Sequence, residues 1–240
     1  MLYAIADLHF GTGINKTMDI FGEKWFNHTQ KIIDNWQSIV GENDTVLIPG
    51  DISWANNLQE AESDFEIIRG LNGRKIMLMG NHDFWWQSMN KVSTAYPDIE
   101  FLQNNFRIYG DYAICGTRGW ICPNTSKFTE NDMKIYKREQ IRLRLSLDSA
   151  VRAGYGGKII GTMHFPPIGE GFEKTGFTDI FEEYGVKKVL YGHIHGEENF
   201  KNIIEGSING IEYELVSADY LDFMPKKISV SDEDTDFLIN

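Results

Sequence analysis

The chain has 240 residues, of which 42% are hydrophobic and 24% charged, which suits one large globular domain or two small ones and excludes a collagenous or low-complexity protein. Its 35 acidic and 23 basic side chains give a formal net charge of −12, which argues against duplex nucleic acid as a partner. No apolar run approaches the roughly 18 residues that span a bilayer, and the first residues do not resemble a signal peptide. We therefore expect a cytoplasmic protein with no membrane partner.

Short apolar runs predict buried strands, because they are nearly continuous in hydrophobicity and too short for buried helices. The runs, in chain order, are 2–6, 46–49, 76–79, 112–115, 159–163 and 189–191. Each run is followed at once by glycine or by a side chain able to hold a cation, except that the run at 112–115 has no evident ligand after it. This repeated arrangement is the main feature of the sequence.

Helical spacing of apolar residues fills the segments between these runs. It predicts helices over 23–41, 56–71, 131–153 and 178–184, with glycines ending the last two. The alternation of strand and helix predicts an α/β fold. After His195, strand-like runs at 203–204, 208–216 and 228–230 have no helices between them, so we expect a second, more antiparallel sheet to be completed there. Residues 1–230 are predicted to form a single domain, followed by an acidic tail at 231–240 that is solvated or frayed.

Eight side chains suited to metal binding follow five of the predicted strands. They are Asp7, His9, Asp51, Asn81, His82, His164, His193 and His195. Ligands gather at the carboxyl ends of strands in an open α/β sheet, so we expect these residues at one edge. Mixed oxygen and nitrogen donors suit Mn, Fe or Zn better than Mg or Ca. A single histidine in such a place is usually structural, but five of the six occupy this edge, and only His28 is left as structural.

The number of potential ligands favours two metal ions over one. A catalytic zinc ion usually takes three or four protein ligands, whereas two ions that share a bridging carboxylate need seven or eight. We therefore expect two divalent metal ions, with Mn, Fe or Zn as the candidates and with the native metal left open.

The order of these residues resembles a known family. Asp7-x-His9, Gly50-Asp51, Gly80-Asn81-His82-Asp83, His164 and Gly192-His193-x-His195 are similar to the five signature blocks of the calcineurin-like metallophosphoesterases. The resemblance covers residues 7–195 and lies closest to the bacterial phosphohydrolase branch. It implies a four-layer αββα sandwich, in which two mixed β-sheets pack face to face with helices outside, and a dinuclear metal centre.

The resemblance also implies individual roles. One ion would be held by Asp7, His9, Asp51 and His195, and the other by Asp51, Asn81, His164 and His193, so that Asp51 is the bridge. The implied reaction is hydrolysis of a small phosphomonoester or phosphodiester by in-line attack of a metal-bridging hydroxide. His82 would act on the leaving group as a general acid or hydrogen-bond donor, and Asp83 would either orient its ring or serve only as a turn carboxylate.

Substrate contacts are harder to predict. Trp85, Trp86 and Trp54 follow two of the blocks and could form a stacking wall for the substrate, although core packing is the more common role of such residues. Arg118 could hold a phosphate in a bidentate manner or take part in an ordinary salt bridge. Two alternatives to a small-molecule phosphoesterase stay open: a catalytically weak metal-binding scaffold, and a nuclease acting on single strands, for which no basic groove is evident.

Overall fold

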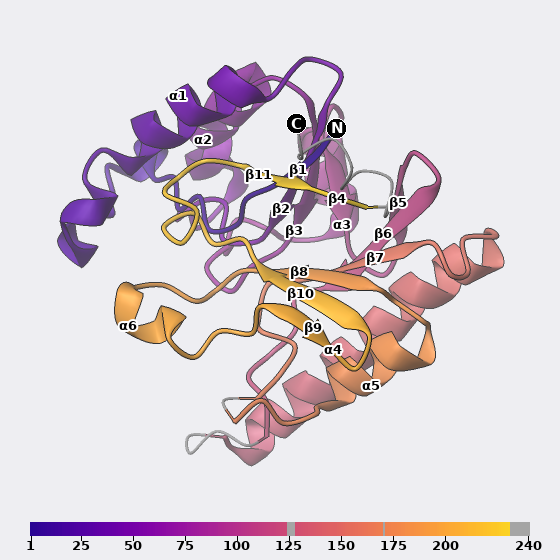
Figure 1. Cartoon of the computed structure of the whole chain (residues 1–240). Helices are drawn as coiled ribbons and strands as arrows, with labels where there is room; N and C mark the ends of the chain where they lie inside the picture. Colours follow the sequence, from indigo (N-terminus) through magenta and orange to yellow (C-terminus); the bar gives the residue numbers. More distant parts are fainter. Residues whose placement is uncertain (124–127, 170, 231–240) are drawn as a thin grey trace, which may run out of the picture.

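Two β-sheets form the centre of the protein in a computed structural model, which describes residues 1–123, 128–169 and 171–230 (Figure 1). A five-stranded sheet has the order β11-β1-β2-β3-β4, and a six-stranded sheet has the order β5-β6-β7-β8-β10-β9. The predicted acidic tail at 231–240 lies outside the described residues.

The first sheet is parallel except at one edge. Its strands are β1 (Leu2–Ala4), β2 (Thr45–Pro49), β3 (Arg74–Leu78), β4 (Glu100–Leu102) and β11 (Lys226–Ile228). Strands β1 to β4 pair in parallel, whereas β11 pairs with β1 in the antiparallel direction. The carboxyl ends of β1, β2 and β3 therefore meet at one edge, where the predicted ligands begin.

The second sheet has a parallel centre between two antiparallel hairpin strands. Its strands are β5 (Phe106–Tyr109), β6 (Tyr112–Thr117), β7 (Ile159–Met163), β8 (Lys188–Tyr191), β9 (Gly206–Ile208) and β10 (Ile211–Leu215). Strands β6, β7, β8 and β10 are parallel, while β5 pairs with β6 and β9 with β10 in the antiparallel direction.

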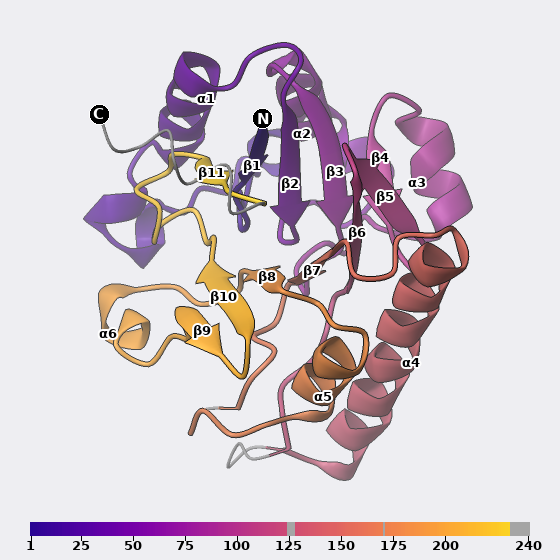
Figure 2. The same cartoon turned by 45° about the vertical axis from the view of Figure 1, so that its right-hand side comes forward.

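Helices cover the outer face of each sheet. They are α1 (His28–Ile39), α2 (Leu58–Gly70), α3 (Met89–Ala95), α4 (Glu130–Arg152), α5 (Gly176–Glu183) and α6 (Glu197–Phe200). Figure 1 shows α1 and α2 on one side of the sheets and α4 and α5 on the other, and Figure 2 shows α4 and α5 against the second sheet. Side-chain caps begin α4 and α5: Thr129 and Thr175 each form a capping box.

Successive side chains along each central strand point alternately to the two faces of its sheet, and this alternation explains the four layers. In β1, Leu2 and Ala4 point between the two sheets, whereas Tyr3 packs toward the helices of the first sheet. In β6, Ile114 enters the space between the sheets and Cys115 faces the helices of the second sheet. Because successive side chains of a strand point to opposite faces, each central strand is covered on both sides. The predicted αββα sandwich is confirmed.

Several boundaries differ from the sequence prediction. The first helix begins at His28 and not at 23, because short 3₁₀ turns occupy Asp19–Phe21 and Glu23–Trp25. The run at 203–204 is not a strand. Strands β9 and β10 complete the second sheet, where β9 is antiparallel to β10 as expected but β10 is parallel to β8, and β11 joins the first sheet antiparallel to β1. The hydrophobic pattern identified apolar segments there but did not reveal their partners. Within the described residues, none of the helices combines the length and the apolar character that a membrane crossing requires.

Candidate metal centre

The seven predicted metal ligands lie on loops that leave the carboxyl ends of five strands. Those loops follow β1, β2 and β3 in the first sheet and β7 and β8 in the second. Two groups of potential ligands form within this set: Asp7 with His9 and His195, and Asp7 with Asp51 and His164. In each group the ligand atoms all lie within 4.8 Å of one another, and Asp7 belongs to both groups.

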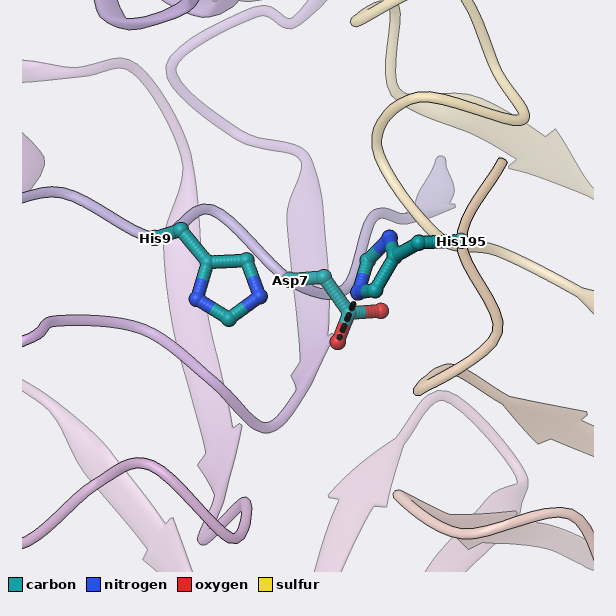
Figure 3. Close-up of side chains that lie close together, drawn as sticks. All are labelled: Asp7, His9 and His195. Atoms are coloured by element: carbon teal, nitrogen blue, oxygen red, sulfur yellow. Dashed lines mark ion pairs between the residues drawn. The ribbon is translucent and has the colours of Figure 1, made fainter. Parts of the chain in front are cut away.

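The first group brings together residues from the loop after β1 and the loop after β8, and Figure 3 shows their side chains converging. The Nε2 atom of His195 lies 3.4 Å from Oδ1 of Asp7. Among the described residues, neither atom has a hydrogen-bond partner, although both are shielded from solvent. Buried polar atoms are rarely left unpaired, so these two are suited to a shared cation.

Asp51 connects the two groups. Its Oδ2 atom lies 3.4 Å from Nε2 of His164 and 3.7 Å from Nε2 of His9. The same His164 nitrogen is 2.7 Å from Oδ1 of Asn81. A carboxylate oxygen thus lies between imidazoles of both groups, which is the position that a bridging ligand would need.

His193 is the remaining predicted ligand, and it lies beside the second group. Its ring centroid is 5.1 Å from that of His164. Its backbone N–H donates a hydrogen bond to Oδ2 of Asp7 at 2.9 Å, which fixes the loop after β8 to the loop after β1. The structure therefore brings all seven predicted ligands to one edge.

Two of the imidazoles are oriented by partners on their other ring nitrogen. Nδ1 of His164 donates to the carbonyl of Pro49 at 3.0 Å, and Nδ1 of His195 donates to Oδ1 of Asp219 at 2.8 Å. Both bonds direct Nε2 toward the centre, as is usual for metal-bound histidines. Sequence reasoning missed Asp219. It follows β10, and the rule used for the other ligands would have found it had β10 been recognised as a parallel strand.

The electrostatics of the group are those of tightly paired acids and bases. Burial opposes charge on His164 and His195, but Asp51 raises the pKa of His164 to about 9 and Asp7 raises that of His195 to about 10. Burial opposes charge on Asp7 as well, yet the charged His195 holds the pKa of Asp7 below its usual range. Burial lowers the pKa of His9 and of His193 to about 3.

The donor set fits divalent transition-metal ions. It combines two buried carboxylates, four imidazoles and one amide oxygen, a mixture that suits Mn, Fe or Zn. Oδ1 of Asp7 and Nε2 of His195 give an independent indication: neither has a hydrogen-bond partner among the described residues, and a cation between them would satisfy both.

His82 lies beside the predicted ligands, and Asp83 lies below them in the core. The backbone N–H of His82 donates to Oδ1 of Asp51 at 2.8 Å. Asp83 is fully buried, and its oxygens accept hydrogen bonds from the backbone N–H groups of Ile52, Ser53 and Gly80 and from the indole of Trp85. These hydrogen bonds connect the loops after β2 and β3. Of the two roles considered for Asp83, they match that of a turn carboxylate and not that of a residue orienting the His82 ring.

A hollow of about 370 Å³ opens onto the predicted ligands, and we call it the aromatic hollow. Its described lining comprises His9, Met18, Phe21, Trp25, Asp51, Trp54, His82, His193, His195 and Gly196. Trp85 was expected at such a wall, but its side chain is 0% exposed and packs in the core of the first sheet. Trp86 is likewise buried. Of the three tryptophans considered for a stacking wall, Trp54 lines the aromatic hollow. Its ring stacks on that of His9, with centroids 4.7 Å apart.

Arg118 follows β6 and does not line the aromatic hollow within the described residues. Its guanidinium lies 3.8 Å from the fully buried carboxylate of Glu139 on α4. Its carbonyl accepts hydrogen bonds from the backbone N–H groups of His164 and Phe165. The side chain thus takes part in the salt bridge that was the alternative to phosphate binding.

His28, which we expected to be structural, is buried at the start of α1. Its Nε2 atom donates to the carbonyl of His9 at 3.2 Å, so it supports the backbone of a predicted ligand.

Comparison with known proteins agrees with the sequence pattern. The family model Calcineurin-like phosphoesterase matches residues 2–197. No curated protein matches the chain.

Solved structures with low sequence identity share the fold. The protein of unknown function AQ665 from Aquifex aeolicus has a TM-score of 0.54 at 18% identity, over 100% of this chain and 99% of that one. The phosphopantetheinyl hydrolase PptH from Mycobacterium tuberculosis has a TM-score of 0.60 at 12% identity, over 97% and 96%. TT1561 of Thermus thermophilus has a TM-score of 0.52 at 11% identity, over 81% of each chain.

Proposed function

The chain belongs to the calcineurin-like phosphoesterase family, and from this premise we propose that it hydrolyses a small phosphoester with two divalent metal ions, Mn, Fe or Zn, held at the candidate metal centre. One observation carries the proposal: the buried Oδ1 of Asp7 and Nε2 of His195, which have no hydrogen-bond partner among the described residues, face each other at 3.4 Å among further ligand atoms. A similar fold is found in a phosphopantetheinyl hydrolase, whose name also describes hydrolysis of an organic phosphoester.

We assign each ion four protein ligands. Asp7, His9, Asp51 and His195 would hold one ion, and Asp51, Asn81, His164 and His193 the other. The place of Asp51 Oδ2 between the rings of His9 and His164 supports its role as the shared ligand. When bound, the two ions supply positive charge that activates water for in-line attack and neutralises the phosphoryl oxygens.

The chain's own residues fix the directions of these ligands. The Pro49 carbonyl and the Asp219 carboxylate keep a proton on Nδ1 of His164 and His195, so that Nε2 is the donor atom toward the metal. Trp54 covers one face of the His9 ring, and this stacking limits rotation of that ring. The side chains are therefore held in place before the substrate arrives, which lowers the reorganisation needed for reaction.

His82 is the residue to which we assign the leaving group. It lines the aromatic hollow, and its backbone N–H is bonded to Asp51. Burial lowers the pKa of the ring, and the negative charge of a bound phosphoester would favour its protonated form again. A protonated His82 would donate its proton to the departing alkoxide.

Replacing His82 by alanine separates catalysis from metal binding. The chain is stripped of metal, reconstituted with Mn and analysed for metal content and for release of phosphate from phenyl phosphate, whose basic leaving oxygen needs a proton. We expect about two Mn per chain in both the native protein and His82→Ala, because His82 is outside the assigned ligand sets. We expect turnover of the variant to fall by about 10²–10⁴-fold, the usual contribution of a general acid.

Asp51→Asn is the comparison variant, because removing the shared carboxylate should lower both metal content and turnover. Full activity of His82→Ala would contradict the role given to His82. A native chain that stays free of metal and inert after Mn reconstitution would instead favour the non-catalytic scaffold.

A further inference from the structure

A second hollow, of about 590 Å³, borders the metal centre on the side of His193 and His195. It is built by the loops after β6, β7 and β8 and by the turn after α6. His193 and His195 also line the aromatic hollow, so these two imidazoles stand between the two spaces. The roles proposed above do not use this second hollow.

The second hollow has an apolar floor and a polar rim. Phe165, Ile168 and Ile204 form part of its wall and are 5%, 6% and 4% exposed. Asn199 and Asn202 are exposed and form part of the polar rim. Within the described residues, no lysine or arginine lines this hollow. It is therefore suited to a group that combines apolar surface with hydrogen-bonding atoms at its outer end.

The position of His82 distinguishes the two hollows. His82 lines the aromatic hollow but is not among the described lining residues of the second. A leaving group that takes its proton from His82 must therefore occupy the aromatic hollow. A phosphomonoester has only one carbon-bearing oxygen, which would leave the second hollow without a substrate group. A phosphodiester has two, and volumes of about 370 and 590 Å³ are each within the range of small-ligand sites.

On the basis of the proposed function, we infer that the substrate is a phosphodiester, with its leaving group in the aromatic hollow and its retained substituent, which combines apolar surface with hydrogen-bonding atoms, in the second hollow. Water forms a new P–O bond, and the P–O bond to the leaving group breaks. The leaving oxygen takes a proton and departs as an alcohol. The other product is the phosphomonoester of the retained substituent.

Three substrates with the same leaving group test this inference. They are 4-nitrophenyl phosphate, methyl 4-nitrophenyl phosphate and phenyl 4-nitrophenyl phosphate, and all release 4-nitrophenol, which is detected as its coloured anion. Only the last carries a substituent large enough to use the second hollow. We expect the Mn-loaded protein to show a KM about tenfold lower for the phenyl diester than for the methyl diester, because burying a phenyl ring removes its apolar surface from water.

Asn202→Trp provides a variant that fills the second hollow from its exposed rim. We expect it to remove the tenfold preference for the phenyl over the methyl diester while Mn content stays at the native value. Asn43→Trp is the matched control, since Asn43 is exposed in the turn before β2, at the opposite ends of the strands, and it should keep the preference.

The outcomes separate this inference from the proposed function. Equal KM values for the two diesters, or an equal effect of Asn202→Trp on all three substrates, would overturn the phosphodiester inference and leave phosphoester hydrolysis intact. A higher kcat/KM for the monoester than for the phenyl diester would overturn it as well. Failure of the Mn-loaded protein to hydrolyse any of the three would instead contradict the proposed function.

Discussion

His195 illustrates how single residues of the centre are controlled by neighbours that are not themselves candidate ligands. Its Nδ1 donates to Asp219, whose second oxygen accepts from the backbone N–H of Gly196. The carboxylate thus holds both the ring and the adjacent backbone. His164 is held in the same way by the Pro49 carbonyl. In each case the partner comes from a strand end or a following turn that is far away in sequence.

Metal uptake should release protons from the centre. His164 and His195, with pKa values raised to about 9 and about 10, are protonated at pH 7 in the metal-free chain, and each must lose one proton to bind a metal through Nε2. We expect about two protons to be released per chain at pH 7, and Mn affinity to rise as the pH increases from 7 to 10. Calorimetry in buffers of different ionisation enthalpy measures both. Uptake without proton release would contradict these protonation states.

Whether the sequence predicted the position of a residue depended on how far that position is set by contacts with distant segments. The convergence of the seven candidate ligands was predictable because each closely follows an apolar strand. The positions of Trp85 and Arg118 were not, since local sequence does not tell whether a side chain turns to the core or to a hollow. Trp85 lies in the core, where its indole donates to the buried Asp83, and Arg118 turns to Glu139. Those two partners are set by packing between elements.

At the scale of elements, the loops that follow the strands adopt backbone conformations that are uncommon for their residues. Asp7, His9, Asp51 and His193 all have positive φ angles, of 61°, 48°, 51° and 74°. Such conformations cost free energy in residues other than glycine and are often found at functional sites. The loops are also packed tightly against each other, because a Cβ atom on Gly80 would lie 2.1 Å from Oδ1 of Asp51. This glycine allows the loops after β2 and β3 to approach.

Gly80→Ala should therefore damage both stability and the centre. We expect the free energy of unfolding to fall by about 1–3 kcal/mol, as for other overpacked sites, and Mn content to fall because Asp51 is displaced. Gly156→Ala is the control, since a Cβ there meets nothing within 4 Å, and its effect should stay within about 0.5 kcal/mol. Denaturant unfolding and metal analysis give the two readouts. Native stability and metal content in Gly80→Ala would contradict the close approach of these loops.

At the scale of the whole molecule, loops from the two sheets are joined by hydrogen bonds beside the candidate metal centre. The backbone N–H of Ala6 donates to the carbonyl of Val216, and the N–H of Ala218 donates to the carbonyl of Ala6. The loop after β1 is thereby bonded to the segment that leaves β10. Four predicted ligands follow strands of the first sheet and three follow strands of the second. Metal ions held by these residues would connect the two halves of the sandwich.

Metal binding should stabilise the chain as a single unit. Each Mn ion at 100 times its dissociation constant contributes about 2.7 kcal/mol to the folded state, so two ions contribute about 5.4 kcal/mol. For a chain of this size, we expect the Tm to rise by about 10–20 °C in one cooperative transition, and EDTA should reverse the change. Differential scanning calorimetry measures both. Two separate transitions, of which only one responds to Mn, would contradict the prediction of a single domain over residues 1–230.

The sequence by itself determined the α/β class, the central strands and the set of candidate ligands, because short apolar runs and the residues directly after them are local properties of the chain. Only the tertiary structure decided the direction of β10, the place of Asp219 beside His195, the burial of Trp85 and the existence of two hollows on either side of His193 and His195. These features depend on which strands pair and which loops pack together. Contacts between distant segments leave no local pattern in the sequence, whereas burial and chemistry at a strand end do.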